Sequence, residues 1–423
     1  MMTQAFYTGI SGLKTYSNGI DVVSDNLANI STTGFRAYNA EYAPLFEESL
    51  ASASSNLLQS NSVGVGVQMQ ATSMSMAQGS LALSDRSTDL AIVGDGWFGI
   101  QREGKPLYTR AGDFVFDANN DLVTNDGYHV LGTVGGNISD DNILTEVHNE
   151  IALGDISTQT KLRFPKTLIY PPEPTTNVKF IANLGVGNEG NEIITISTNV
   201  IDPENSKNTL RLEFTKSATQ VSPGMQWDVV ATVNSPDGAT IYDTQTGQLS
   251  FDESGALIGS TLNSINNNGA PITFDFGSGY DGMVSIDVPV VPGSTIADGT
   301  IGGELEGYDI SKNGEVIATF TNGRQSSVGR IALYHFQNDQ GLERISGTRF
   351  AKSSNSGEAI FFKDKNGQNI MGAEISNFKL ESSNVAMSEG LTELIILQRA
   401  YDANSKSVTT ADQMIQKALQ MDA

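Results

Sequence analysis

The chain has 423 residues, and its 48 acidic against 25 basic residues give a formal net charge of −23. A chain this acidic does not bind a polyanion over a broad face, so nucleic acid is excluded as a partner. It contains no cysteine and three widely separated histidines, which excludes thiolate chemistry and disulfides and gives no basis for a metal site, a cofactor or a catalytic base.

The first residues lack the basic region and the apolar stretch of a secretory signal, and no run approaches the ~18 apolar residues of a membrane span. We therefore expect no cleaved signal peptide and no membrane insertion. The chain either remains in the cytosol or leaves the cell by a route that keeps its N-terminus. The lack of cysteine favours the second route.

The N-terminal segment predicts a long amphipathic helix that ends near Asn29. Apolar residues recur at every seventh position in two series offset by three, which is the a/d pattern of a coiled coil. The series are Phe6, Leu13, Ile20 and Leu27, and Tyr16, Val23 and Ile30. The small polar residues from Ser31 onward, with Gly34 able to take a positive φ, are typical of a helix end.

The C-terminal segment predicts a second long helix of the same kind. Its two series are Met387, Leu394, Tyr401, Val408 and Ile415, and Leu397, Asn404, Ala411 and Ala418, of which Asn404 is the polar exception. Ser383 or Asn384 is placed to cap the start of this helix. Arg399, Asp402 and Lys406 have the spacing of helical ion pairs, as surface pairs or as contacts between subunits.

Two interpretations fit these apolar seams. The helices could each cover a globular core, or they could pair with each other as a terminal coiled coil. Their lengths of about 40 and 55 Å, at 1.5 Å per residue, and the β-rich sequence between them favour the coiled coil. The remaining apolar positions would then face other subunits: Ile10, Val22, Leu391, Ile395, Met414 and Leu419.

Between the helices the sequence predicts turn-rich β structure in two nested domains. The predicted division is a helical domain (1–33 and 384–423), a connector (34–72), an inner β-domain (73–167 and 301–383) and an outer β-domain (168–300). Four prolines between 165 and 174 mark the boundary of the outer domain, because they favour an extended linker over sheet.

Individual strands can be proposed in both domains. Within the inner domain, Leu90–Val93 and Trp97–Ile100 flank a Gly-Asp-Gly turn and predict a hairpin. The strands predicted in the outer domain include 192–197, 210–214, 227–232, 272–276 and 284–288.

Carboxylates in two places allow a chemical alternative. Asp117, Asn119 and Asp121 suggest a calcium loop, but an EF-hand needs glycine at position six and glutamate at twelve, where this chain has Leu122 and Tyr128. An Asx-rich hairpin turn is the simpler interpretation.

In the outer domain, acidic residues at alternate strand positions could include the acid/base pair of a glycosidase. They are Glu213, Asp228, Asp275 and Asp287. Nothing in their spacing requires such a pair, so a solvated face is the simpler interpretation.

The string from Asp25 to Phe35, DNLANISTTGF, resembles the N-terminal signature of the flagellar axial proteins, a family of rod, hook and hook-associated proteins. The residues that carry this match are Asn26, Leu27, Ala28, Asn29, Thr33, Gly34 and Phe35. Residues 94–132 resemble the inner β-domain of the same family, through Gly-aromatic-Phe, Tyr-Thr-Arg-x-Gly-x-Phe and Asp-x-x-x-x-Leu-Val. Residues 350–357, 396–404 and 410–415 resemble its closing segment and C-terminal motif.

The resemblance covers both helices and both halves of the inner domain, and the additional outer domain is similar to the hook branch of the family. It implies a mainly β fold with a terminal α-helical coiled coil and nested, discontinuous domains. It also implies a structural subunit, not an enzyme, that self-assembles into a flexible curved tube and transmits motor torque to the filament as a universal joint. The helix seams would then serve subunit assembly through Phe6, Leu13, Ile20, Val23, Leu27, Ile30, Leu394, Leu397, Tyr401, Val408 and Ile415.

The partners implied by the resemblance are further copies of the chain, the distal rod, the hook-associated junction proteins, the hook cap and the flagellar (type III) export apparatus. The implied location is the bacterial flagellum, outside the cell after export. One alternative is the distal rod protein, a stiff straight tube of the same family, because the connector at 36–62 is longer than in hook proteins with a short linker. Another is an exported acidic adhesin or carbohydrate-binding protein, which has no need of seamed helices at both ends.

Overall fold

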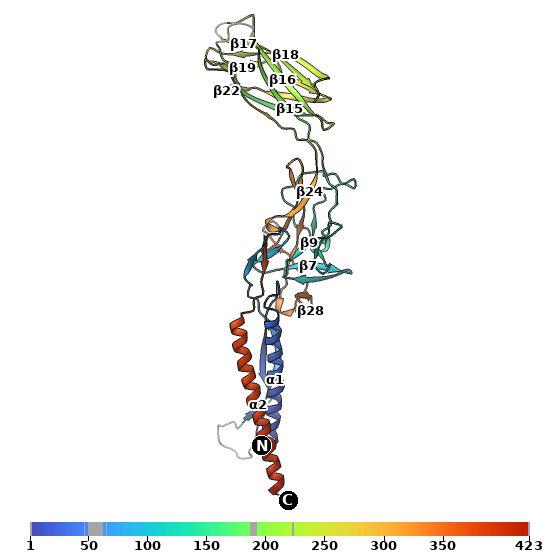
Figure 1. Ribbon diagram of the computed structural model, residues 1–423, viewed down its shortest axis with the longest axis vertical. Helices are drawn as coiled ribbons and strands as arrows, with labels where there is room; N and C mark the ends of the chain where they lie inside the picture. The colour runs from blue at the N-terminus through green and yellow to red at the C-terminus, as the bar shows by residue number, and fades with distance from the viewer. Residues whose placement is uncertain are drawn as a thin grey trace.

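The computed structural model describes residues 2–45, 47–49, 62–64, 66–186, 193–221 and 224–421. The molecule is elongated, and three units follow one another along its long axis (Figure 1). A pair of helices lies at one end with both termini, an inner β-domain lies in the middle, and an outer β-domain lies at the far end. The predicted fold class is confirmed, since the chain is mainly β between two terminal helices.

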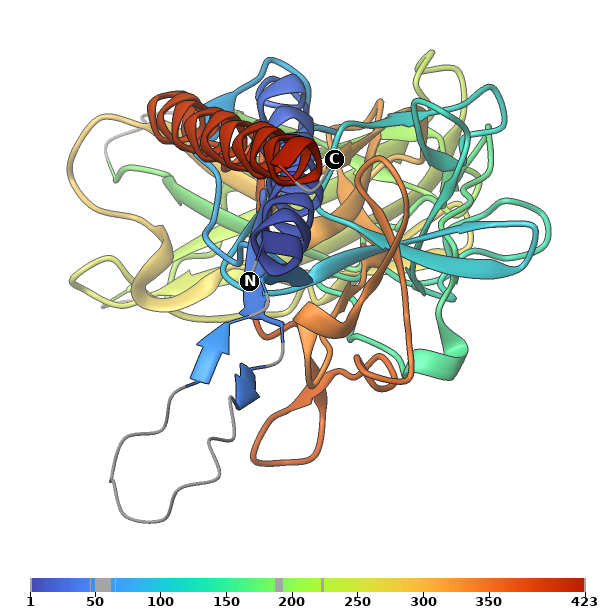
Figure 2. The ribbon, with the colours of Figure 1, turned by 90° about the horizontal axis from the view of Figure 1, so that it is seen from below.

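The helical unit consists of α1 (Met2–Ala28) and α2 (Met387–Met421), which lie side by side (Figures 1 and 2). The end of α1 agrees with the predicted stop, and Gly34 has a φ of +67°. The predicted cap of α2 is wrong, because the helix begins three residues after Asn384. The Asn384 side chain instead binds the backbone at residues 37, 75 and 77.

A β-hairpin accompanies the helices where the sequence predicted a connector. It consists of β1 (Tyr38–Pro44) and β4 (Val67–Met74), with β2 (Glu47–Ser49) and β3 (Ser62–Gly64) paired beyond them. The Thr15 hydroxyl of α1 donates to the carbonyl of Val67 at 2.9 Å, and the Tyr42 hydroxyl packs against Gly19. The hairpin therefore belongs to the helical unit, although residues 50–61 of the predicted connector lie outside the described part of the chain.

The inner β-domain is built from two stretches of the chain that lie far apart in sequence. The first stretch supplies β5 (Leu81–Leu83), β6 (Leu90–Val93), β7 (Trp97–Arg102), β8 (Lys105–Thr109), β9 (Phe114–Phe116), β10 (Leu122–Thr124), β11 (His129–Val134), η1 (Ile156–Thr158), β12 (Thr160–Lys161) and β13 (Ile169–Tyr170). The second supplies β24 (Gly303–Ile310), η2 (Lys312–Gly314), β25 (Glu315–Phe320), β26 (Gln325–Ile331), β27 (Leu333–Tyr334), η3 (Asp339–Gly341), β28 (Glu343–Ser346), β29 (Arg349–Ala351), β30 (Phe362–Lys363), β31 (Asn369–Ile370), β32 (Glu374–Asn377) and β33 (Lys379–Glu381).

Strands of both stretches share the main sheet of this domain. Its order is β13-β24-β25-β26-β11-β7-β8-β29-β28, so β26 of the second stretch pairs with β11 of the first. Trp97, Phe98, Phe114 and Phe320 are almost fully buried in its core. Because these pairings join the two stretches, the inner domain forms only when both are present.

The hairpin predicted from Leu90–Val93 and Trp97–Ile100 is wrong. The two segments are strands, but β6 pairs with β32, whereas β7 pairs with β8, β11 and β27. Gly94 and Gly96 have φ of +105° and +136°. Such conformations are open mainly to glycine, and here they redirect the chain from one sheet to another instead of closing a hairpin.

The outer β-domain is a continuous insertion with its own core. Its strands are β14 (Asn177–Asn183), β15 (Ile194–Ile201), β16 (Lys207–Lys216), β17 (Met225–Asn234), β18 (Ile241–Phe251), β19 (Ala256–Ser260), β20 (Ser264–Asn267), β21 (Ala270–Asp275), β22 (Gly277–Val284) and β23 (Val291–Ala297). Their order is β15-β16-β17-β18-β19-β22-β14-β21-β20, with β23 on β14. Trp227, Phe180, Phe214 and Phe251 fill the core.

Four of the five strands predicted in this domain are present with shifted ends. The fifth, 284–288, is wrong, because the strand there is the preceding glycine-rich segment β22. After Val284 the backbone turns away, with the Ser285 N–H donating to Gly255 O at 2.9 Å. Glycines lower strand propensity, which is why this segment was missed.

Four hairpin turns share one arrangement, in which an aspartate oxygen accepts hydrogen bonds from the N–H groups two and four residues further on. They begin at Asp117, Asp202, Asp252 and Asp364. The turn at Asp117 is therefore the predicted Asx turn. The other carboxylate of the supposed calcium loop, Asp121, is bound by Arg163 through two hydrogen bonds of 2.6 Å.

Asp202 is fully buried, and its second oxygen accepts hydrogen bonds from the amides of Asn208 at 3.1 Å and Asn268 at 2.9 Å. Burial by itself raises the pKa of this carboxyl, but the hydrogen bonds from Asn268, Ser206, Asn208 and Glu204 together hold its pKa below the ordinary value. The charged form is thus favoured in the folded state.

Because that pKa is lower in the folded than in the unfolded chain, Asp202 contributes stability above the ordinary aspartate pKa of about 3.9, and this is lost as the pH falls through the folded value. Asp202→Asn removes this acid-dependent term. It also turns an amide donor toward two other amide donors, so we expect a loss of about 1–3 kcal/mol at pH 7. Urea unfolding of the outer domain at pH 7 and pH 3 measures both effects, with Asp237→Asn in an exposed turn as the control.

The inner and outer domains are joined by only two segments of chain (Figure 1). Glu173 and Thr300 exchange two backbone hydrogen bonds of 2.9 Å between these segments. The proline-rich stretch that predicted a linker lies here. On the outer side, the Gly302 N–H donates to the Asn205 side chain at 2.7 Å.

Candidate assembly surface and interdomain joint

The middle of the seam predicted on α2 lies against α1, whereas Met387 and Ala418 at its two ends are exposed. Leu397 and Ala411 are 4% exposed, Leu394, Asn404, Val408 and Ile415 are half-buried, and Tyr401 is 39% exposed. An added Cβ at Gly9 of α1 would lie 2.6 Å from the Val408 side chain, and one at Gly12 would overlap the Asn404 amide. Asn404, the polar residue of the seam, therefore occupies the space left free by the absence of a side chain at Gly12.

The surface that α1 presents to α2 differs from the predicted one. Gly9, Gly12 and Gly19 are buried at this contact, and of the predicted seam residues only Val23, 2% exposed, is fully enclosed. The others, Phe6, Leu13, Ile20, Leu27 and Ile30, are half-buried. The prediction considered only large apolar residues, so it missed a contact made by glycines. The sequence pattern that could have indicated this contact is the spacing of the three glycines by three and seven residues.

Both helices leave apolar side chains open to solvent in the single chain. Those at least 40% exposed are Tyr7 and Ile10 on α1, and Met387, Leu391, Ile395, Ile396, Met414 and Leu419 on α2. The sequence placed five of these positions toward other subunits; its sixth residue there, Val22, is half-buried. Clusters of exposed apolar side chains of this kind typically mark interaction surfaces.

The charged residues on α2 remain free. Within the described part of the chain, Arg399, Asp402 and Lys406 form no ion pair with each other or with other residues. The expected intrahelical pairs are therefore not formed there.

The signature residues after α1 form a joint between the helices and the inner domain. The buried Asn26 amide donates to Tyr38 O at 2.7 Å and accepts from Tyr38 N–H at 2.9 Å. These two hydrogen bonds are the same as those that the backbone of a neighbouring β-strand would make to Tyr38. The Asn384 amide accepts from Ala37 N–H at 2.7 Å and donates to Ser75 O and Ala77 O. Two asparagines thus fix both strands of the hairpin to the helix ends.

The rest of the signature shapes the turn that follows. Asn29 donates to Asp25 O at 2.8 Å and closes the last turn of α1. Gly34 lies so close to the backbone at Ala111 that no Cβ fits, and Phe35 is 2% exposed. Ala28 is exposed and Thr33 half-buried, so only part of the signature is explained by contacts within the chain.

Glu381 is the buried centre of this joint, and the sequence analysis did not single it out. Its side chain, 1% exposed, lies 3.1 Å from Arg36 and 3.5 Å from Arg110. It also accepts from Gly79 N–H at 3.0 Å, and its carbonyl accepts from Gly34 N–H at 2.8 Å. The segments that leave α1, return from the hairpin and enter α2 therefore meet at one carboxylate.

The two arginines carry their charge into the interior. Burial lowers the pKa of Arg110 to about 10, against the opposing effect of Glu381, and burial likewise lowers the pKa of Arg36. Both stay protonated at neutral pH, so this site holds two buried positive charges against the Glu381 carboxylate, with smaller contributions from Asp95 and Asp339. The only feature of the sequence that pointed to this site was the presence of charged residues, Arg36 and Glu381, close to the helix ends.

Replacing Asn26 with aspartate tests the joint directly. A carboxylate cannot donate to Tyr38 O, and it places a charge beside that carbonyl, so we expect a loss of about 1–3 kcal/mol of local stability. Hydrogen exchange of the Tyr38 amide measures it, with Asn39→Asp on the exposed side of β1 as the control. Equal exchange in the two variants contradicts the proposed pairing.

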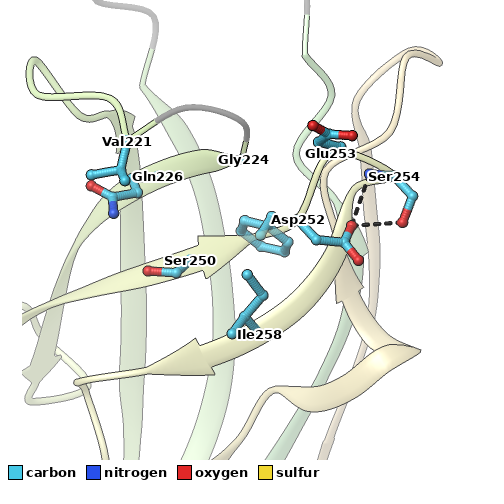
Figure 3. A pocket seen from close by; sticks show the side chains of 9 residues that line it. Val221, Gly224, Gln226, Ser250, Asp252, Glu253, Ser254 and Ile258 are labelled. Carbon is cyan, nitrogen blue, oxygen red and sulfur yellow. Dashed lines mark hydrogen bonds between the residues drawn. The ribbon is translucent and has the colours of Figure 1, made fainter.

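A hollow of about 520 Å³ lies in the outer domain, lined by residues at the start of β17, the end of β18 and in β19 (Figure 3). Exposed Val221 and Ile258 border it, and its Asp252 carboxylate is engaged by Ser254 in its own turn. The acidic residues considered for a glycosidase lie elsewhere: Glu213, Asp228 and Asp275 are in strands and Asp287 is in the loop after β22. Glu213 is paired to Arg211 at 2.6 Å. This geometry supports no acid/base pair in the hollow.

Among the described residues, no group of three or more acidic or histidine side chains is arranged to hold a metal ion. The described helices also include none with the length and apolar character needed to cross a bilayer.

Three families of known proteins match parts of the chain. Residues 6–36 match the flagella basal body rod protein family, residues 91–163 the D1 domain of the flagellar hook protein FlgE/F/G, and residues 378–421 the C-terminal region of the flagellar basal body rod FlgEFG proteins. The first and third matches contain α1 with the joint and α2, and the second lies in the inner domain.

Flagellar hook proteins FlgE match almost the whole chain. That of Borreliella burgdorferi is 28% identical, covering 99% of this chain and 100% of the relative. Those of Brucella suis and Escherichia coli K12 are 28% and 26% identical, with at least 96% of each chain covered. The solved structure of the Helicobacter pylori flagellar hook protein FlgE2 aligns with a TM-score of 0.49 at 17% identity, over 71% of this chain and all of that one.

The curated relatives extend through the outer domain, so the distal rod and adhesin alternatives are not favoured. Their family is one of structural proteins and not of enzymes. The chain is similar to the flagellar basal-body rod and hook proteins in these three regions, and it resembles flagellar hook proteins over almost its whole length.

Proposed function

We propose that the chain is the structural subunit of a flagellar hook, a flexible curved tube that transmits motor torque to the filament. The observation that carries the proposal is the helical unit, which leaves eight large apolar side chains exposed at one end of a long molecule. Burying such a side chain fully contributes about 1.5–3 kcal/mol. Copies that pack these helices together would gain that free energy several times over.

The domain order suggests how such a tube is layered. The helices form its inner wall, the inner β-domains surround them, and the outer β-domains lie outermost on their two-segment connections. The outer domains touch through polar, glycine-rich faces that slide at low cost when the tube bends. The helix seam residues contribute to the contacts between the helices of neighbouring copies indirectly, because they hold α1 and α2 together as one unit.

We place the subunit in the flagellum, outside the cell, after passage through the flagellar export apparatus without cleavage of a signal peptide. Its neighbours in this proposal are the distal rod at the base, the hook-associated junction proteins at the tip and the hook cap during growth. Recognition of these proteins would use the same helical end.

Electron microscopy of the purified chain, concentrated in polymerising salt, tests the proposal. We expect curved tubes from the native chain, and none from a variant with Ile395→Lys and Ile396→Lys, because charges then replace apolar contacts between copies. Ile258→Lys, which changes an isoleucine 71% exposed at the opposite end of the molecule, should still form tubes. Straight rigid tubes would favour the distal rod, and tubes from the double variant would contradict assembly through α2.

A further inference from the structure

A second, more exposed contact ties α1 to the inner domain beside the buried joint. Arg344 of β28 donates to the Asp25 carboxylate of α1 at 2.7 Å and to Gly347 O at 3.0 Å. Its guanidinium carbon lies 5.3 Å from the ring centre of Phe35 and 5.4 Å from that of Tyr38. One arginine therefore contacts the helix, the signature loop and the first strand of the hairpin.

The position of Asp25 is unfavourable for the helix alone. It stands one turn before the C-terminal end of α1, where the helix dipole favours positive side chains. Asp25 also accepts from the Asn29 amide at 3.0 Å. The Arg344 charge offsets the electrostatic cost, so the aspartate is accounted for by a contact outside its helix.

The two contacts differ in how firmly they hold. The side chains of Arg36, Arg110 and Glu381 are 1–3% exposed, and several backbone groups surround them. The side chains of Arg344 and Asp25 are 31% and 46% exposed. A guanidinium keeps a favourable contact with an aromatic face over a range of positions within about 6 Å, so Arg344 can shift across its two rings without losing either.

We propose that the Asp25–Arg344 pair is an adjustable latch that sets the angle between the helix pair and the inner β-domain, while the Glu381 site keeps the two units attached. Breaking the latch leaves both units folded and joined but widens the range of angles between them. If the chain forms the proposed hook, that angle also sets the curvature of the tube, and this second consequence rests on the proposed function.

Distance measurements by electron paramagnetic resonance test the latch in the single chain. The protein has no cysteine, so Lys14→Cys on α1 and Lys105→Cys in the inner domain, both exposed positions, can carry the only spin labels. We expect one narrow distance distribution in the otherwise native chain. Arg344→Gln should replace it with a shifted or broadened one, whereas Arg344→Lys, which keeps the charge, should retain most of the narrow peak.

Salt provides an independent readout. Raising the ionic strength from about 0.1 M to about 1 M shortens the screening length from about 10 Å to about 3 Å, so it should broaden the native distribution in the same direction. Lys352→Gln removes a different half-exposed ion pair of the inner domain, that with Glu358 at 2.6 Å, and should change nothing. An unchanged distribution in Arg344→Gln, or the same change in Lys352→Gln, overturns the latch.

Tube curvature separates this inference from the proposed function. If Arg344→Gln alters the distances and also the curvature of tubes, both stand. If it alters the distances but neither chain forms tubes, the latch stands and the hook proposal fails. Unaltered distances refute the latch even when tubes form.

Discussion

Gly12→Leu is expected to abolish assembly while leaving both β-domains folded. The Asn404 amide occupies the space above Gly12, and even a single Cβ there overlaps it. A leucine must therefore push α2 away from α1, and overpacking of this kind typically costs about 1–3 kcal/mol, or more. The separated helices no longer form the unit from which the exposed apolar residues project.

The substitution Gly12→Ala distinguishes the effect of packing on stability from that of helix propensity, because the two effects have opposite signs. Glycine inside a helix is about 1 kcal/mol less favourable than alanine, so Gly12→Ala would stabilise an isolated α1. In this chain we expect Gly12→Ala to destabilise the helix pair, because the Asn404 side chain must leave its position. Circular dichroism during thermal unfolding measures the helical transition, and electron microscopy measures assembly.

A matched control is available in Gly307 of β24, around which nothing lies within 4 Å of an added Cβ. Gly307→Leu should leave the helical transition and tube formation unchanged. A Gly12→Leu chain that assembles like the native one would show that the contact between α1 and α2 does not position the assembly surface.

Glu381→Gln is expected to cause a large loss of stability. The substitution keeps the shape of the side chain but leaves Arg36 and Arg110 buried without the carboxylate in contact with them, and only the weaker attraction of Asp95 and Asp339 remains. Breaking a buried ion pair on one side typically costs about 3–5 kcal/mol. The segments around both helix ends meet at this carboxylate. The helical unit and the inner domain should therefore no longer unfold together in one transition.

Chemical denaturation followed separately by circular dichroism and by tryptophan fluorescence, in a Trp227→Phe background where Trp97 is the only tryptophan, would show this uncoupling. The control is Glu358→Gln, whose carboxylate is 79% exposed and pairs with Lys352; exposed pairs contribute at most about 1 kcal/mol. A replacement of Arg36, Arg110 and Glu381 together by apolar residues should recover part of the loss, because no unpaired charge remains. If Glu381→Gln unfolds with native midpoints by both probes, Glu381 does not hold the joint.

The two helix seams show which contacts a seven-residue repeat can predict and which it cannot. On α2, Leu397, Asn404 and Val408 of the predicted series lie against α1, because a seven-residue repeat is a local property of a helix. On α1, the repeat of large residues was real but only partly faced the partner. Helix contact depends on which face permits close approach, and Gly9 and Gly12 permit it only because Val408 and Asn404 lie opposite.

The strand predictions divide in the same way. Leu90–Val93 and Trp97–Arg102 were recognisable as strands from their composition, but their distant partners, β32 and β27, were not. The same holds for the joint, where residue 381 meets residues 36 and 110. Pairing across more than two hundred residues is set by the shape of the assembled domain, and no local pattern encodes it.

The sequence by itself determined the two terminal helices, the nested order of the domains, the proline-rich linker and the resemblance to the flagellar family, because periodicity, turn residues and motifs act over a few neighbouring positions. Only the tertiary structure decided which face of α1 meets α2, and that the hairpin accompanies the helices. It alone also showed that Glu381 and Arg344 connect the helical unit to the inner domain. These contacts join residues distant in sequence, and their free energy arises from burial and charge pairing that exist only in the folded chain.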